Sequence, residues 1–177
     1  MVSTPFDSYF DSVMRDIERN AWSHHCSSSA RTVFASQGLH EAIASGNEKA
    51  VLLTLLKNLR SVEEPLRAPI VEGTHIGFTP VMTALVVGDP QVIRLLVSYG
   101  ATTVSRCPSD HHNTVLHYAC SCRAVPSLDL LLLSVRRDAL VEPNDEGLTP
   151  LHVASQLGYV DVVAKLLASA ASYQKNF

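Results

Sequence analysis

Apolar and polar positions between 144 and 167 predict two short helices in succession. Gly147 fits a turn, Thr149 can cap a helix that starts at Pro150, and Gly158 can end that helix after about two turns. The second helix has apolar residues on one face, namely Val162, Val163, Leu166 and Leu167. A helix pair of this size cannot bury that face alone, so the pattern predicts neighbouring copies.

The same pattern recurs along the chain. Thr79, Thr114 and Thr149 are spaced at 35 and 35 residues, and Leu39-His40-Glu41-Ala42 upstream matches Leu151-His152-Val153-Ala154. These units resemble ankyrin repeats, whose period is about 33 residues. The resemblance implies an all-α solenoid of about four helix-turn-helix repeats, at roughly 36–72, 74–107, 109–142 and 144–173, in a domain spanning 36–177.

Two positions depart from the family pattern inside the array. Arg123 stands where the other repeats have a glycine, a place that commonly needs positive φ, and we expect a strain of about 1 kcal/mol there. Met82 replaces the histidine that follows the Thr-Pro-Leu element in the family. We therefore expect the array to be less regular than an ideal one.

Each end of the array carries a polar substitution. Glu41 occupies the position of Tyr118 and Val153, which indicates that this face meets water. Lys165 stands where earlier repeats have leucine, which suggests that the fourth repeat is terminal. We interpret the array as complete between these substitutions.

The first 35 residues precede the repeats. Thr4-Pro5 begins a predicted helix in which Phe6, Phe10, Val13 and Ile17 form one stripe, and a Ser-rich linker follows from Ser23. This extra N-terminal helix either packs back on the repeats or binds a partner. The spacing leaves both interpretations open.

The connection between the first two repeats is about seven residues longer than the others. Its segment 62–69 contains two prolines and clustered charge, which favours an ordered, non-helical excursion on the surface. It is either a tolerated insertion or a binding element.

Composition narrows the class of protein. The chain has 177 residues, is 46% hydrophobic and carries a net charge of −3, values that suit one folded domain. Basic residues are dispersed, so we expect no nucleic-acid partner, and no apolar run is long enough to span a membrane. We expect an intracellular protein, cytoplasmic or nuclear, that is monomeric by itself and has reduced cysteines.

One cluster raises a chemical hypothesis, that of a metal-binding or redox-sensing protein. It comprises Cys107, His111, His112, His117, Cys120 and Cys122. The spacing does not suit an ordinary zinc site, and the repeat pattern already assigns a capping role to His117. Cys26 beside two histidines lies in the linker, without a scaffold. We find no catalytic motif, so we predict neither enzyme activity nor a cofactor, although dispersed catalytic residues would escape a motif search.

The family resemblance implies a module that binds another protein through a concave groove and the hairpin tips, as an adaptor, scaffold or inhibitor. Carried over by offset from each threonine, the candidate partner-binding residues are His75, Ile76, Phe78, Val86, Val87, Asp110, His111, Asn113, Ser121, Cys122, Asp145, Glu146, Leu148, Gln156 and Leu157. Some of the apolar members could instead pack against the N-terminal helix or the first connection. Leu151 and Leu167, by contrast, are expected in the core.

Overall fold

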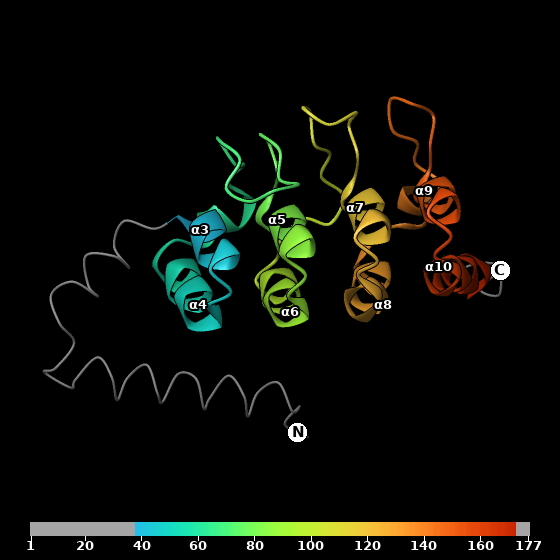
Figure 1. Ribbon diagram of the computed structural model, residues 1–177. Helices are drawn as coiled ribbons and strands as arrows, with labels where there is room; N and C mark the ends of the chain where they lie inside the picture. The colour runs from blue at the N-terminus through green and yellow to red at the C-terminus, as the bar shows by residue number, and fades with distance from the viewer. Residues whose placement is uncertain (1–37, 173–177) are drawn as a thin grey trace, which may run out of the picture. The chain divides into compact units, whose positions relative to one another are not determined.

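The computed structural model describes residues 38–172, which form a row of four helix pairs (Figure 1). A tight turn joins the two helices of each pair, and a longer connection with an extended tip leads to the next pair. The helices are α3 Leu39–Ala44, α4 Glu48–Lys57, α5 Pro80–Val87, α6 Pro90–Ser98, α7 Val115–Ser121, α8 Val125–Ser134, α9 Pro150–Gln156 and α10 Val160–Ser172. The predicted all-α solenoid is therefore confirmed, while the predicted N-terminal helix lies outside the described residues.

The remaining regular structure in residues 38–172 is small. Two 3-10 helices, η1 Leu59–Glu63 and η2 Arg137–Leu140, lie in the connections. One isolated antiparallel bridge joins Arg106 to Thr114, so the hairpins do not form a sheet within this part of the chain. None of these helices is long and apolar enough to cross a bilayer.

The helices start at the repeat threonines and end at the glycine position, as the sequence predicts. Thr149 caps α9, its hydroxyl accepts from the His152 amide, and the His152 ring in turn accepts from the Thr149 amide. Gly88 ends α5 with φ 82°, and Arg123 has φ 50° at the equivalent place after α7. The expectation of a non-glycine residue with positive φ at this position is confirmed.

Small residues let neighbouring pairs stack closely. Within the described chain, the first helices contact one another in the order α3, α5, α7, α9, and the second helices contact one another in the order α4, α6, α8, α10. A fully buried alanine lies five residues after each repeat threonine, and the first repeat has one at the matching position. These residues are Ala42, Ala84, Ala119 and Ala154. An alanine at this place lets adjacent helices approach without a void, so one continuous apolar core runs through the row.

The last repeat differs from the sequence-based interpretation. Glu41 is exposed in the first repeat, as predicted, but the Lys165 ammonium binds both carboxylate oxygens of Asp129 on α8 and so points back into the array. Lys165 is therefore not a polar cap on the outer side of the last repeat. Leu167 is 53% exposed and Leu151 is half-buried, so the prediction that Leu167 is a core residue is wrong.

The long first connection is ordered but not wholly non-helical. Val62 and Glu63 belong to η1, where Val62 is buried, so the predicted absence of helix is wrong for these two residues. Leu66 is buried, its amide donates to the Phe78 carbonyl, and its carbonyl accepts from the Gly77 amide. These bonds tie the inserted segment to the start of the second repeat.

Candidate functional site

The connections between repeats project as hairpin-like tips from one side of the helix row (Figure 1). The fourth residue before each repeat threonine lies at these tips, and it is His75, Asp110 or Asp145. Acids and histidine at the same place in consecutive repeats line up along the row. This arrangement brings together side chains that are 35 residues apart in sequence.

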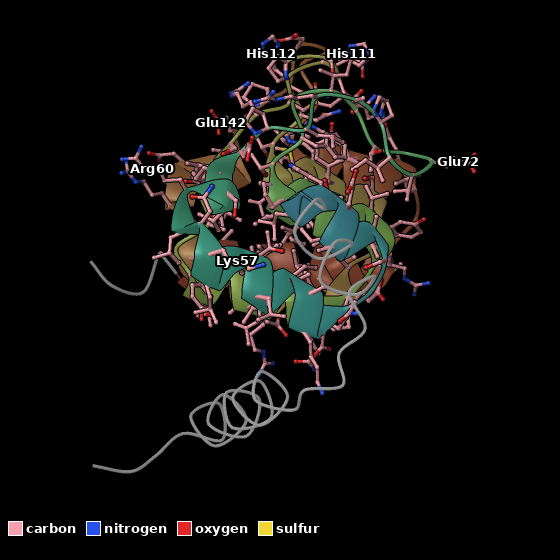
Figure 2. All side chains as sticks on the ribbon, turned by 90° about the vertical axis from the view of Figure 1, so that its left-hand side faces the viewer. Lys57, Arg60, Glu72, His111, His112 and Glu142 are labelled. Carbon is pink, nitrogen blue, oxygen red and sulfur yellow. The ribbon has the colours of Figure 1, made fainter. Side chains whose placement is uncertain are left out.

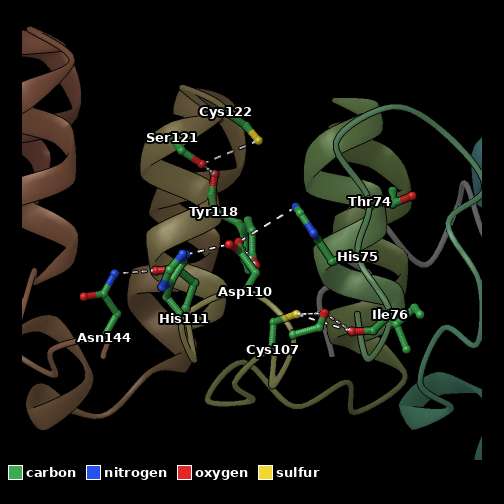
Figure 3. Close-up of polar contacts among 12 residues, drawn as sticks. Thr74, His75, Ile76, Cys107, Asp110, His111, Tyr118, Ser121, Cys122 and Asn144 are labelled. Carbon is green, nitrogen blue, oxygen red and sulfur yellow. Dashed lines mark hydrogen bonds and ion pairs between the residues drawn. The ribbon is translucent and has the colours of Figure 1, made fainter. Parts of the chain in front are cut away.

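Asp110 is the centre of the contacts between the second and third tips (Figure 3). Its Oδ2 accepts hydrogen bonds from the Tyr118 hydroxyl at 2.5 Å and from Asn113 Nδ2 at 3.1 Å, and His75 Nε2 lies 4.0 Å away. Partial burial acts to raise the pKa of Asp110, but the hydrogen bonds from Tyr118 and Asn113 outweigh it and lower the pKa. Asp110 is therefore an ionised acceptor near neutral pH.

Two asparagines connect the third tip to the fourth. Asn144 Nδ2 donates to Asn113 Oδ1 at 2.9 Å, and Asn144 Oδ1 accepts from the amides of Glu146 and Leu148. Asn144 is 7% exposed, and its side chain makes three hydrogen bonds here, as a buried amide requires. A continuous set of polar contacts thus runs from His75 to Leu148 and fixes the tips relative to one another.

The third tip ends in two histidines with unusual backbone. His111 and His112 have φ 47° and φ 51°, a conformation that few residues other than glycine adopt. His112 Nδ1 lies 2.7 Å from Asp145 Oδ2, and the Asp145 amide donates to the His111 carbonyl at 2.9 Å. His111 Nδ1 is 3.7 Å from a Glu146 carboxylate oxygen. Figure 2 shows both histidines at the outer end of the hairpins.

Phe78 is not on the surface, and its predicted role as an exposed partner contact is wrong. The side chain is fully buried, with its ring 4.7 Å from the Tyr118 ring and 5.4 Å from the His75 ring, centroid to centroid. Phe78 fills the space between the second and third repeats because Tyr118 of the next repeat provides an aromatic surface for it. It is a core residue that supports the tips.

The inserted segment covers part of the first helix of the second repeat. A Cβ built on Gly73 would lie 3.4 Å from Val86 Cγ1, so the backbone of this segment passes directly over Val86. Val86 and Val87 are half-buried, and both pack against the core. Figure 2 shows Glu72 at the end of the same segment, extending sideways from the hairpins. The inserted segment therefore covers part of α5 at Val86, whereas Ser121 at the end of α7 and Gln156 at the end of α9 are exposed.

The other predicted site residues are wholly or partly accessible. The half-buried ones, besides Val86 and Val87, are His75, Asp110, Asn113 and Leu148; the exposed ones are Ile76, His111, Ser121, Cys122, Asp145, Glu146, Gln156 and Leu157. Ile76 is 54% and Leu157 is 47% exposed, which leaves apolar area on an otherwise polar surface.

Three residues that shape this site were not among the predicted site residues. Tyr118 holds Asp110, His112 pairs with Asp145, and Asn144 connects the tips. Asn144 lies five residues before its repeat threonine, at the turn, where asparagine commonly bonds to nearby backbone amides. That preference is the signal in the sequence that could have identified it.

The cysteine and histidine cluster is dispersed by the fold. Cys107 and Cys120 are buried, Cys122 is exposed, and no group of three or more potential ligands could hold a metal ion within residues 38–172. Burial raises the pKa of Cys120 to about 12, which keeps this thiol protonated and unreactive near neutral pH. His117 accepts from the Thr114 amide and forms the predicted capping contact.

Repeated helix pairs with aligned tips define a class of protein whose surface is built for contact with other macromolecules. The sequence profile described as ankyrin repeats (3 copies) matches residues 39–141 and 106–176, and the chain belongs to this family. It is therefore a protein–protein interaction module, and the members of this family are non-catalytic.

One curated protein and one solved structure are similar to this chain in sequence. The chain is 34% identical over 137 residues to the B-cell lymphoma 3 protein homolog of Mus musculus, and the match covers 75% of this chain and 29% of the relative. The crystal structure of the ankyrin repeat domain of Bcl-3, described as a unique member of the IkappaB protein family, matches with a TM-score of 0.59 and 31% identity. That match covers 75% of this chain and 56% of the Bcl-3 chain, so this chain spans only part of both relatives.

Proposed function

We propose that residues 36–177 bind a partner protein through one surface, which we call the tip surface. It is formed by Ile76, His111 and Asp145 in the connections and by Ser121 and Leu157 at the ends of α7 and α9. The module acts as an adaptor or inhibitor inside the cell, in the cytoplasm or nucleus, as a member of the IkappaB type. The similarity to Bcl-3 supports this type.

The observation that carries the proposal is the connection of three successive tips by side-chain contacts from His75 to Leu148. Ordering three separate tips when a partner binds would cost conformational entropy for each one. The contacts through Asp110, Asn113 and Asn144 meet that cost within the free protein. A surface of this kind is preorganised and suits a partner that contacts several repeats at once.

The apolar members of the tip surface are the expected anchors. Ile76 and Leu157 are about half exposed, so each keeps apolar area that a partner can cover. Buried interface anchors of this kind contribute about 2 kcal/mol or more each. The half-buried His75, Val86, Val87 and Leu148 line the same region as secondary contacts.

Replacing Ile76 and Leu157 together with Asp tests the proposal. The double variant should melt within about 2 °C of the wild type, because neither side chain is in the core, and it should no longer capture the principal partner from native extract. Leu133→Asp is the matched control, because Leu133 is 86% exposed on α8, away from the tips. Equal loss of capture in both variants, or normal capture by the double variant, contradicts the proposal.

A further inference from the structure

The third tip is the point to which the tips on either side of it are attached. The second, third and fourth tips are residues 74–78, 107–113 and 144–148. On one side, the Ser109 hydroxyl donates to the Ile76 carbonyl at 2.5 Å, and the Cys107 thiol donates to the same oxygen at 3.6 Å. Pro108 packs closely on Gly77, where an added Cβ would lie 2.9 Å from Pro108 Cδ. The second tip therefore rests on the third.

The fourth tip is attached to the third from the other side. His112 Nδ1 lies 2.7 Å from Asp145 Oδ2, and the Asp145 amide donates to the His111 carbonyl at 2.9 Å. Asn144 Nδ2 donates to Asn113 Oδ1. Among the residues that the structure describes, the second and fourth tips share no hydrogen bond with each other. Each of them therefore depends on the third tip for its position.

One side chain fixes the third tip to the helix stack. Tyr118 lies on α7 and is 6% exposed, and its hydroxyl donates to Asp110 Oδ2 at 2.5 Å (Figure 3). The Tyr118 ring packs edge-on against the Phe78 ring, with the centroids 4.7 Å apart. The ring thus belongs to the core, while the hydroxyl reaches the tip.

The equivalent position in the neighbouring repeats provides no such bond. In the second repeat it is Thr83, whose hydroxyl lies 2.8 Å from His40 Nδ1. In the fourth repeat it is Val153, which has no polar side-chain atom. The acids at the tips differ accordingly: the Asp110 side chain is 21% exposed, whereas that of Asp145 is 57% exposed. The third tip is held by its own repeat, and the fourth takes its support from the neighbouring tip.

We infer that Tyr118 is the positioning residue of the tip surface. Its hydroxyl holds the third tip on α7 through Asp110, and in this way it also sets the positions of Ile76 in the second tip and Asp145 in the fourth. Without that hydroxyl, Asp110 keeps a donor from its own tip, Asn113, but loses the bond to a helix. A partly buried carboxylate that loses a donor moves toward water, and the attached tips move with it. The inference rests on the proposed function in one respect, that the tips contact a partner.

Tyr118→Phe tests the inference, because it keeps the ring against Phe78 and removes the hydroxyl alone. Backbone order parameters from ¹⁵N relaxation of the full chain report the result without any partner. We expect them to fall to about 0.6 or below in all three tips and to stay at about 0.85 in the helices. Tyr99→Phe is the matched control: it makes the same chemical change after α6, outside the tips, and should leave every order parameter unchanged.

Asn144→Ala separates the third tip from the tips that depend on it. Asn144 connects the fourth tip to the third and bonds to the amides of Glu146 and Leu148. Its loss should lower the order parameters of the fourth tip and leave those of the second and third unchanged. Tyr118→Phe should also raise the pKa of Asp110, measured from its carboxyl ¹³C shift, because the Tyr118 hydrogen bond helps to lower that pKa.

Three outcomes would overturn the inference. A lower urea midpoint for Tyr118→Phe with unchanged order parameters means that Tyr118 only stabilises the core. A loss of order confined to the third tip means that the neighbouring tips do not depend on it, and an unchanged Asp110 pKa means that the hydroxyl does not hold the carboxylate.

Capture from native extract tests the proposed function separately. Tyr118→Phe should weaken capture of the principal partner, since a disordered surface must pay the entropy of ordering when it binds. Loss of tip order in Tyr118→Phe, combined with normal capture by this variant and by the Ile76 and Leu157 double variant, refutes the proposed function and supports the positioning role.

Discussion

Met82→His should complete the start of α5, where the capping threonine of the second repeat has no partner for its hydroxyl. Thr79 Oγ1 is the side-chain polar atom that is buried without a hydrogen-bond partner in residues 38–172. In the third and fourth repeats the histidine three residues after the threonine bonds to that hydroxyl, at 2.8 Å for His117 and 3.0 Å for His152. Met82 is fully buried at the same place and cannot form this bond.

The gain can be worked from the equivalent contacts of His117. A histidine at 82 forms bonds to the Thr79 hydroxyl, the Thr79 amide and the Asn113 carbonyl, each contributing about 1 kcal/mol. The Asn113 carbonyl already accepts from the Cys107 amide, but a second bond is possible. The Leu148 carbonyl accepts from both the Asn144 amide and His117. Losing the burial of the methionine side chain costs about 2 kcal/mol. The net stabilisation is about 1 kcal/mol.

Urea unfolding followed by circular dichroism at 222 nm measures this difference, and thermal melting should show a rise of about 3 °C. His117→Met makes the reverse change in the third repeat and should destabilise by about 1 kcal/mol, because it removes the bonds to the Thr114 hydroxyl, the Thr114 amide and the Leu148 carbonyl and gains the burial of a methionine side chain. A lower midpoint for Met82→His, or no loss for His117→Met, would refute the reasoning.

Three further predictions concern stability. Leu116→Ala should lower the free energy of unfolding by about 2–5 kcal/mol, because Leu116 is fully buried. The equivalent Leu151→Ala should lower it by clearly less, because Leu151 is half-buried. Equal losses in urea titrations would contradict this. Gly88→Ala should cost about 1 kcal/mol by the same measurement, because φ is 82° there. Burial lowers the pKa of His40 and His117. The free energy of unfolding should therefore be at its full value above pH ~6.5 and fall as the pH drops below it. His117→Gln should reduce this loss at low pH.

Local signals in the sequence were sufficient for the helix pairs. Thr149 with Pro150 starts a helix and Gly158 ends it wherever the rest of the chain lies, because capping and positive φ are properties of a few adjacent residues. The positive φ of Arg123 followed from the same offsets. The repeat period then determines which helices are neighbours.

The direction in which individual side chains point was harder to predict. Phe78 and its equivalent Leu148 share an offset, yet Phe78 is fully buried because Tyr118, 40 residues later, provides its packing surface. Lys165 interacts with Asp129 of the preceding repeat, 36 residues away. A helical period indicates which face of a helix is apolar, but these contacts depend on the identity of a residue in the next or preceding repeat.

The inserted segment over Val86 gives the protein one place where recognition can change without cost to the architecture. Its tip, near Glu72 and Gly73, lies outside the helix stack, and Leu66 anchors it to the start of the second repeat. Changes in the length or sequence of this tip would therefore uncover or shield the first helix behind it and leave every helix in register. Evolution, or a protein engineer, could retune partner choice here by exchanging a single surface loop.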